Sequence, residues 1–273
     1  MRRGGNRWLT AFAVLIYSFL FAPIVVLIVF SFNISRRNFV WLGFTTDWYP
    51  KLFANQSLLD APGVKIQVAA IAVVGSTILG SLLGLGLARL KFRGSGQTET
   101  LLLLPMVTPE IIMGISLLIF FAQLFGQNGS LGQIAIAHVT FCISYVAVTV
   151  RARAAGMDPR LEEAARDLGA SAWGAFWHVT LPLIAPAVAA GAMLAFALSF
   201  DDLVITSFNT GVGSTTLPVE IYSAIKLGVS PQINAISTVI VAVVSIALFI
   251  AWRLGAFRTE QAAPVVEDAP AAG

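Results

Sequence analysis

Charged residues are scarce in this chain of 273 residues, where they make up 11% of the positions and hydrophobic residues make up 57%. The mean hydropathy is +0.83, whereas a soluble globular chain is about one quarter charged. This composition excludes an ordinary soluble domain and predicts an integral membrane protein. The formal net charge of +3 arises mostly at the ends of apolar segments, where membrane topology explains it, so nucleic acid is not an expected partner.

Residues that carry enzyme chemistry are also few. Cys142 is the single cysteine and lies in an apolar run, so no intrachain disulfide is possible. The two histidines, His138 and His178, lie in different segments, and no Cys, His and acid group has the spacing of a metal site. Each lysine is followed by Leu, Ile or Phe, so the G-K-[ST] of a phosphate-binding loop is absent. We expect no enzymatic activity, no bound cofactor and no ATP hydrolysis by this chain alone.

Long apolar segments dominate what remains, and about 20 helical residues are enough to cross a bilayer. Six segments meet this length: residues 8–32, 64–88, 101–125, 132–150, 183–207 and 233–254. The first is longer than the core of a secretory signal, about 7 to 15 residues, so it is kept as a span. The sequence predicts an all-α membrane domain over residues 1–258, followed by a disordered Ala/Pro-rich cytoplasmic tail, 259–273.

The basic residues predict the orientation. Six spans place both termini on one side, and twelve of the 17 Lys and Arg residues then lie on that side. Because basic residues accumulate in cytoplasmic loops, both termini and the 158–182 segment are predicted to be cytoplasmic. Residues 33–63 then form an exterior loop, with aromatic residues that favour an interface belt or a short surface helix.

The 158–182 segment carries the signals of a helix, a break and a second helix. Asp158 and Pro159 favour a helix start, and Gly169 favours a stop. Ser171 is suited to cap the second helix, which Pro182 is expected to end. Apolar residues at helical spacing form a narrow face on the first helix and an aromatic stripe on the second: Leu161, Ala164, Ala165, Leu168, Trp173, Phe176 and Trp177. Such a pair of helices needs a partner surface.

The same segment resembles the EAA loop of ABC-type importer permeases, EAA-x3-G-x9-I-x-L-P. The matching residues are Glu163, Ala164, Ala165, Gly169, Val179, Leu181 and Pro182. Val179 stands where the family has Ile and keeps a β-branched apolar side chain. The alternative is a surface helix that lies on the membrane interface without a partner.

The resemblance implies a type I-like ABC importer permease fold, in which the loop is a coupling helix that docks on a separate ATPase. It also implies the partners of such a permease: a second permease subunit, expected to be non-identical, two ATP-binding subunits that use ATP and Mg, and a periplasmic or surface-anchored substrate-binding protein.

Acidic residues at membrane depth are the candidates for a substrate pathway. Glu110 lies about ten residues into the third segment, near mid-membrane, after the helix-interrupting Pro105 and Pro109, and Asp201 and Asp202 lie in the outer half of the fifth. A carboxylate at this depth costs at least about 2.5 to 3.5 kcal/mol, so it is expected to face a pathway or a partner. No embedded basic residue is expected beside these acids, which suggests a route for cations.

The exterior side adds further candidates. Glu220 is a fourth acid there, and Phe200, Phe208 and Tyr222 are nearby aromatics suited to cation–π contact or to packing.

Each acid also has a structural interpretation. Asp201 and Asp202 can be solvated or capping residues at the end of a short fifth span, and Glu110 can bond a neighbouring helix. Adjacent residues point about 100° apart on a helix, so at most one of the two aspartates faces a ligand squarely. Asp202 is the preferred one.

Three further stretches, residues 101–118, 199–211 and 215–235, resemble the corresponding parts of spermidine/putrescine ABC importer permeases. This resemblance implies a flexible cationic substrate and a location in the bacterial inner membrane. Rival functions are an ABC permease for another small cationic or polar solute, an ion-driven secondary transporter with Glu110 and Asp202 as proton sites, and a structural membrane anchor. An oxyanion route is disfavoured, because no intramembrane arginine or lysine is expected.

Overall fold

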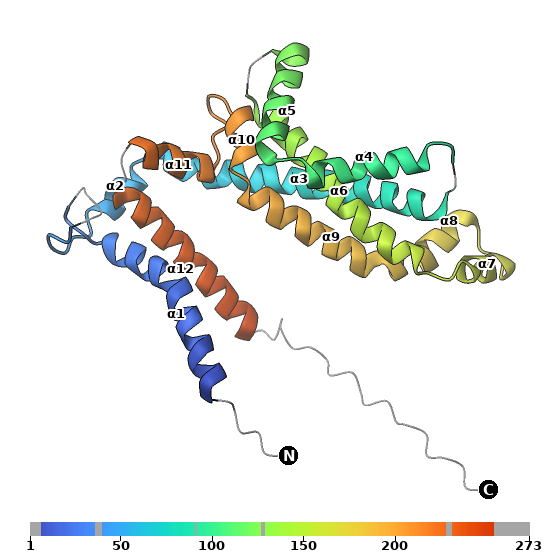
Figure 1. Ribbon diagram of the computed structural model, residues 1–273, viewed down its shortest axis with the longest axis horizontal. Coiled ribbons are helices and arrows are strands. Elements are labelled where there is room, and N and C mark those ends of the chain that lie inside the picture. Colours follow the sequence, from blue (N-terminus) through green and yellow to red (C-terminus); the bar gives the residue numbers. More distant parts are fainter. Residues whose placement is uncertain (1–6, 36–39, 91, 127–128, 228–230, 254–273) are drawn as a thin grey trace, which may run out of the picture. The chain divides into compact units, whose positions relative to one another are not determined.

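The computed structural model describes residues 7–35, 40–90, 92–126, 129–227 and 231–253 (Figure 1). Within these ranges the regular elements are helices. One isolated β-bridge pairs Asn33 with Phe44. The predicted all-α class is confirmed. The predicted tail, 259–273, lies outside the described residues.

The described residues divide into two compact units, and the smaller one holds both ends of the chain. It contains α1 (Arg7–Phe30), most of α2 (Trp48–Phe53), and α12 (Pro231–Arg253), with α1 and α12 side by side (Figure 1). The indole Nε1 of Trp48 donates a hydrogen bond of 2.7 Å to the carbonyl of Asn33 and anchors α2. Within this unit no residue of the strongly apolar helix α1 is buried.

The larger unit, residues 53–228, is built on three long helices. These are α3 (Gln56–Arg89), α6 (Leu131–Ala155) and α9 (Leu181–Asp201), which pack against one another (Figure 1). Shorter elements complete it: α4 (Ser95–Val107), α5 (Glu110–Phe125), α7 (Arg160–Asp167), α8 (Ala172–Ala175), the π-helical turn η1 (Phe176–Thr180), α10 (Val204–Asn209) and α11 (Leu217–Leu227).

Glycines allow α3 to approach α6 closely. A Cβ atom at Gly80 would lie 2.7 Å from the Cβ of Val146, and one at Gly84 would overlap the carbonyl oxygen of Ala147. Small residues let membrane helices pack backbone to backbone in this way. The contact makes α6 the most buried helix of the unit.

The third predicted span is broken. The sequence predicted one span over residues 101–125, interrupted before Glu110 by Pro105 and Pro109, and the chain forms two helices there, α4 and α5, which meet at Thr108 and Pro109 with a bend of 110°. Pro109 lacks an N–H and disfavours a helical conformation for the residue before it, which accounts for the break. Five described helices are long and apolar enough to cross a membrane, and the α4–α5 pair would be a sixth.

Two other helix limits differ from the expected ones. Helix α3 begins at Gln56, eight residues before the predicted span, because Asn55 caps it through the backbone N–H of Leu58. Pro182 does not end the second helix of the 158–182 segment, since it lies in the first turn of α9, where a missing N–H is tolerated. The helical run therefore continues through η1 and ends at Asp201 instead of residue 207.

Candidate functional site

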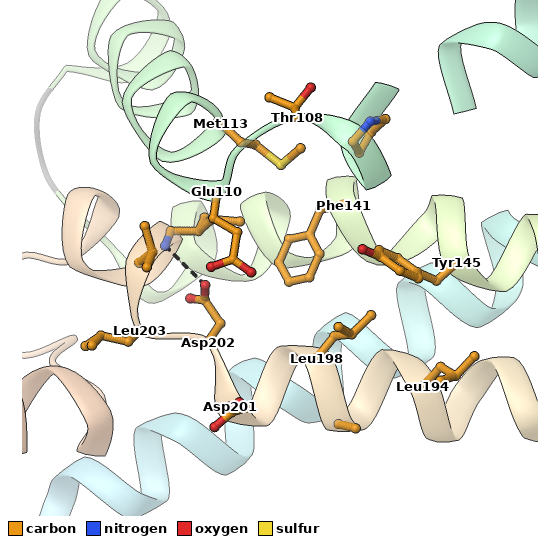
Figure 2. Close-up of a pocket in the computed structure, with 14 residues that line it drawn as sticks. Thr108, Glu110, Met113, Phe141, Tyr145, Leu194, Leu198, Asp201, Asp202 and Leu203 are labelled. Atoms are coloured by element: carbon orange, nitrogen blue, oxygen red, sulfur yellow. Dashed lines mark hydrogen bonds between the residues drawn. The ribbon is translucent and has the colours of Figure 1, made fainter. Parts of the chain in front are cut away.

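A cavity of about 370 Å³ lies where the α4–α5 break faces α6 and the corner between α9 and α10 (Figure 2). Its polar lining residues are Thr108, Glu110, Tyr145, Asp201 and Asp202. Its apolar lining includes Met113, Phe141, Leu194 and Leu198. The volume is that of a small-ligand site, about 300 to 1,000 Å³. Three of the seven candidate pathway residues, the acids Glu110, Asp201 and Asp202, therefore line one cavity.

Glu110 reaches the cavity because the helix breaks directly before it. It is the first residue of α5, where the helix dipole stabilises a negative charge, and it is exposed. Its side chain extends from α5 toward the corner that carries Asp202 (Figure 2). Glu110 thus belongs to a helix terminus, in agreement with the interruption predicted before it from Pro105 and Pro109.

The carboxylate of Asp202 is occupied by partners within the chain. It accepts hydrogen bonds from the backbone N–H groups of Ile205 (3.1 Å) and Thr206 (2.9 Å), and so caps α10. The hydroxyl of Thr206 donates to it at 2.6 Å, and Nε2 of His138 lies 3.2 Å away. With its side chain only 4% exposed, Asp202 fixes the corner between α9 and α10.

His138 is fully buried and joins three helices. Its Nδ1 lies 2.7 Å from the hydroxyl of Ser199 on α9, and its Nε2 lies 2.9 Å from the hydroxyl of Thr206 on α10. Sequence reasoning gave this residue no role. The available signal was a polar ring in the middle of an apolar segment, which requires partners on neighbouring helices.

Lys65 contradicts the expectation that no basic residue lies beside the acids. It is 1% exposed, and its Nζ donates a hydrogen bond of 2.7 Å to the carbonyl oxygen of Asp202. Asp201 and Asp202 both act on it electrostatically. The expectation was wrong because α3 starts before the predicted span of residues 64–88, so that Lys65, the second residue of that span, is the tenth residue of the helix.

Asp201 differs from its neighbour. Asp201 is exposed and lines the cavity. It makes no hydrogen bond or ion pair within the described part of the chain. In Figure 2 it points to the opposite side of the chain from Asp202. The geometry therefore favours Asp201 over Asp202 as a residue with a carboxylate available to a ligand.

The other predicted pathway residues are not among those that line this cavity. Glu220 on α11 accepts a hydrogen bond of 3.0 Å from Ser57 on α3. Phe200 stacks on Phe196 with ring centroids 5.3 Å apart. The Nζ of Lys226 lies over the ring of Tyr222, 4.6 Å from the ring centroid.

Two aromatic residues of α6, Phe141 and Tyr145, line the cavity instead. Phe208, the remaining aromatic candidate, belongs to a different pocket. Sequence reasoning missed the α6 pair because they lie about 60 residues from the aspartates, and a four-residue spacing of aromatics is common in packed helices.

The 158–182 segment forms the predicted helix–turn–helix. Oδ1 of Asp158 accepts the N–H of Arg160 at 3.0 Å before α7. Gly169 ends the helix with φ of +91°, a conformation that glycine adopts without strain. The hydroxyl of Ser171 accepts the N–H of Gly174 at 3.1 Å and caps α8.

The apolar face of this segment is uncovered within the chain. Leu168 is 91% exposed and Trp173 is 68% exposed, with Leu161 and Trp177 close to half exposed. Glu163 and Ala164 are exposed as well. These residues form an accessible apolar and acidic surface at the EAA motif.

Glu162 is a contact residue that the motif did not indicate. Its Oε1 accepts hydrogen bonds from Nη2 of Arg89 on α3 (3.0 Å) and from the hydroxyl of Thr180 in η1 (2.6 Å). It thereby joins α7 to two long helical runs. The motif directed attention to its neighbour Glu163.

Comparison with known proteins places these features in a family. The family model described as "Binding-protein-dependent transport system inner membrane component" matches residues 76–256, more than half of the chain. The chain belongs to this family. It is therefore a multi-pass inner membrane permease component of a binding-protein-dependent ABC transport system, and the predicted family is confirmed.

Curated relatives cover nearly the whole chain. It is 42% identical over 260 residues to the putrescine transport system permease protein PotI of Escherichia coli K12, covering 93% of this chain and 92% of the relative. It is 44% identical over 243 residues to the spermidine/putrescine transport system permease protein PotC of the same strain, covering 89% and 91%.

Solved structures confirm the fold. A chain of a bacterial ABC transporter involved in alginate import matches with a TM-score of 0.67 at 17% identity, covering 94% of this chain and 98% of that one. The same kind of transporter in complex with a periplasmic protein that carries an alginate pentasaccharide matches with a TM-score of 0.66 at 16% identity. At these identities the likeness supports the type I-like permease fold.

Proposed function

We propose that this chain is one of two permease subunits of an ATP-driven importer of polyamines, with putrescine and spermidine as substrates. The observation that carries the proposal is the cavity lined by the three acidic residues Glu110, Asp201 and Asp202. The printed functions of the two Escherichia coli relatives support the same substrate class.

The lining of the cavity suits a flexible organic cation. An ammonium group that leaves water needs carboxylates to replace its hydration, and two exposed acids, Glu110 on α5 and Asp201 at the end of α9, are among the residues that line the cavity. The rings of Phe141 and Tyr145 offer faces for cation–π contact, and the leucines beside them accept the methylene chain.

The 158–182 segment is proposed to dock on a separate ATPase. Its uncovered apolar face and its exposed EAA residues are the features that fit a groove on such a partner. Two ATP-binding subunits, which use ATP and Mg, would close on ATP and move this segment. A non-identical second permease and a substrate-binding protein complete the proposed system.

The proposed orientation has both termini in the cytoplasm, as the distribution of basic residues favours. A cysteine placed at exposed Leu168 tests it. A membrane-impermeant thiol reagent is expected to label this cysteine in inside-out vesicles and not in intact cells. Labelling from outside would reverse the orientation.

The substrate assignment is tested by uptake of labelled putrescine and spermidine in vesicles that contain this chain with its genomically neighbouring ATPase and permease, with binding protein supplied. Wild-type uptake is expected to require ATP and to fall at least tenfold in Asp201→Asn and Glu110→Gln. Asp60→Asn is a matched control, because Asp60 is an exposed acid on α3 outside the cavity lining. Assembled complexes that hydrolyse ATP and take up neither amine would contradict the proposal and favour another solute.

A further inference from the structure

Lys65 is a buried cation in a unit whose cavity is otherwise acidic. It is the tenth residue of α3 and is 1% exposed, and among the described residues no other lysine or arginine is buried. Burying an ammonium group is costly unless a hydrogen bond and opposite charges compensate it. A charged lysine is therefore stable at this position only if hydrogen bonds and opposite charges offset the cost of burying its ammonium group.

The compensation comes from the end of α9. The Nζ of Lys65 donates to the carbonyl of Asp202, the residue that caps the C-terminus of that helix. Carbonyl groups at a helix C-terminus carry partial negative charge and lack intrahelical donors. The carboxylates of Asp201 and Asp202 add two negative charges that act on the same ammonium group.

Lys65 does not touch the cavity itself. It is absent from the cavity lining, and it contacts the backbone of Asp202, whose side chain is already bound by His138 and Thr206. A substrate in the cavity would thus meet Glu110 and Asp201 directly. Lys65 would act on the substrate only electrostatically, as a positive charge that does not contact it.

We propose that Lys65 is a specificity-determining residue whose ammonium group offsets part of the negative charge of the Glu110, Asp201 and Asp202 cavity, and so disfavours amines of higher total charge. The inference rests on the proposed function, since it assumes that the cavity takes organic cations. A diamine and a triamine differ by one ammonium group, and in a low-dielectric site one fixed charge discriminates between them.

The test compares the ratio of kcat/KM for spermidine to that for putrescine in reconstituted wild-type and Lys65→Gln complexes. Gln keeps a donor for the Asp202 carbonyl and removes the charge. The ratio is expected to rise roughly tenfold, the factor for one unit charge acting across about 10 Å at an effective dielectric constant of about 20. Lys65→Arg keeps the charge and is expected to keep the ratio within about twofold.

A purely structural role gives a different result. Loss of packing or of the hydrogen bond would lower uptake of both amines in proportion and leave the ratio unchanged, and that outcome would overturn the role of Lys65. Wild-type vesicles that import neither amine would overturn the proposed function, and the inference with it, so the two failures are distinguishable.

Assembly offers a second measurement if Lys65→Gln cannot be purified with its partner subunits. The double variant Lys65→Gln/Asp201→Asn removes one charge of each sign and is expected to restore assembly. If the double variant also fails to assemble, Lys65 is required for packing and not for its charge, and the proposal is wrong.

Discussion

Arg89 on α3 and Glu162 on α7 form an ion pair, with 3.0 Å between Nη2 and Oε1. Because Thr180 donates to the same carboxylate oxygen, Glu162 connects the EAA segment to the end of α3 and to the helical run that becomes α9. A displacement of α7 by a docked partner would be transmitted to both helices through this residue. The side chains of the pair are 20% and 34% exposed, so water screens the interaction only in part.

Neutralising this pair is expected to uncouple transport from ATP hydrolysis. In Glu162→Gln or Arg89→Gln, amine uptake per ATP hydrolysed should fall about threefold to fivefold, the equivalent of about 1 kcal/mol for a partly buried charged hydrogen bond. The double variant should fall no further, because both changes remove one interaction. Uptake and phosphate release are measured on the same vesicles.

Arg93→Gln is the control for this prediction, since Arg93 follows α3 closely and is exposed without a partner in the described residues. An equal loss in all variants would show that the effect does not depend on the ion pair.

The turn at Gly169 is expected to tolerate glycine and little else. Its φ of +91° is unfavourable for L residues, although a Cβ there would meet open space. Gly169→Val should therefore weaken the turn by roughly 1 to 2 kcal/mol through backbone strain alone. We expect reduced copurification of the ATPase and loss of uptake, with normal amounts of the chain in the membrane. Gly96→Ala is a control, since Gly96 has equal space without a positive φ. Normal uptake in Gly169→Val would contradict the docking role.

The EAA segment shows which structural features can be predicted from the sequence. The cap at Ser171 and the stop at Gly169 depend on contacts within a few residues, so local patterns were sufficient to predict them. The cavity depends on residues far apart in the chain. Lys65 and Asp202 are separated by 137 positions. Their contact follows from the packing of α3 against α9, which a single sequence does not display.

The α4–α5 break is an intermediate case. Pro105 and Pro109 predict an interruption of the helix before Glu110, but they do not predict the angle of 110° between the two helices. Proline removes a donor and restricts its neighbour, whereas the direction of the next helix is decided by what it packs against. Here α5 packs against α10, which brings Glu110 to the cavity.

Truncating the two adjacent aspartates is expected to have opposite consequences. Asp202→Ala removes the cap of α10 and a partner of His138, so it should destabilise the protein by about 2 to 4 kcal/mol and lower its Tm in detergent. Asp201→Ala removes no hydrogen bond or ion pair of the described residues and only one of the two charges that act on Lys65, so it should lower the Tm less than Asp202→Ala does, while uptake collapses. Thermal unfolding and uptake on the same preparations separate the two roles. A loss of Tm in Asp201→Ala as large as that in Asp202→Ala would remove its assignment as the available carboxylate.

Gly84 and Gly86 provide a matched test of the α3–α6 contact. A Cβ at Gly84 would overlap the carbonyl oxygen of Ala147 and lie 3.1 Å from the backbone nitrogen of Arg151, whereas one at Gly86 would meet nothing within 4 Å. Backbone atoms of a packed helix cannot move aside cheaply, so Gly84→Ala should cost roughly 1 to 3 kcal/mol. Gly86→Ala should be neutral or stabilise α3 by up to about 1 kcal/mol, because alanine favours helix. Both Tm values are measured on the purified chain in detergent. Equal shifts would mean that α3 can move away from α6, and that the close approach of their backbones does not hold the unit together.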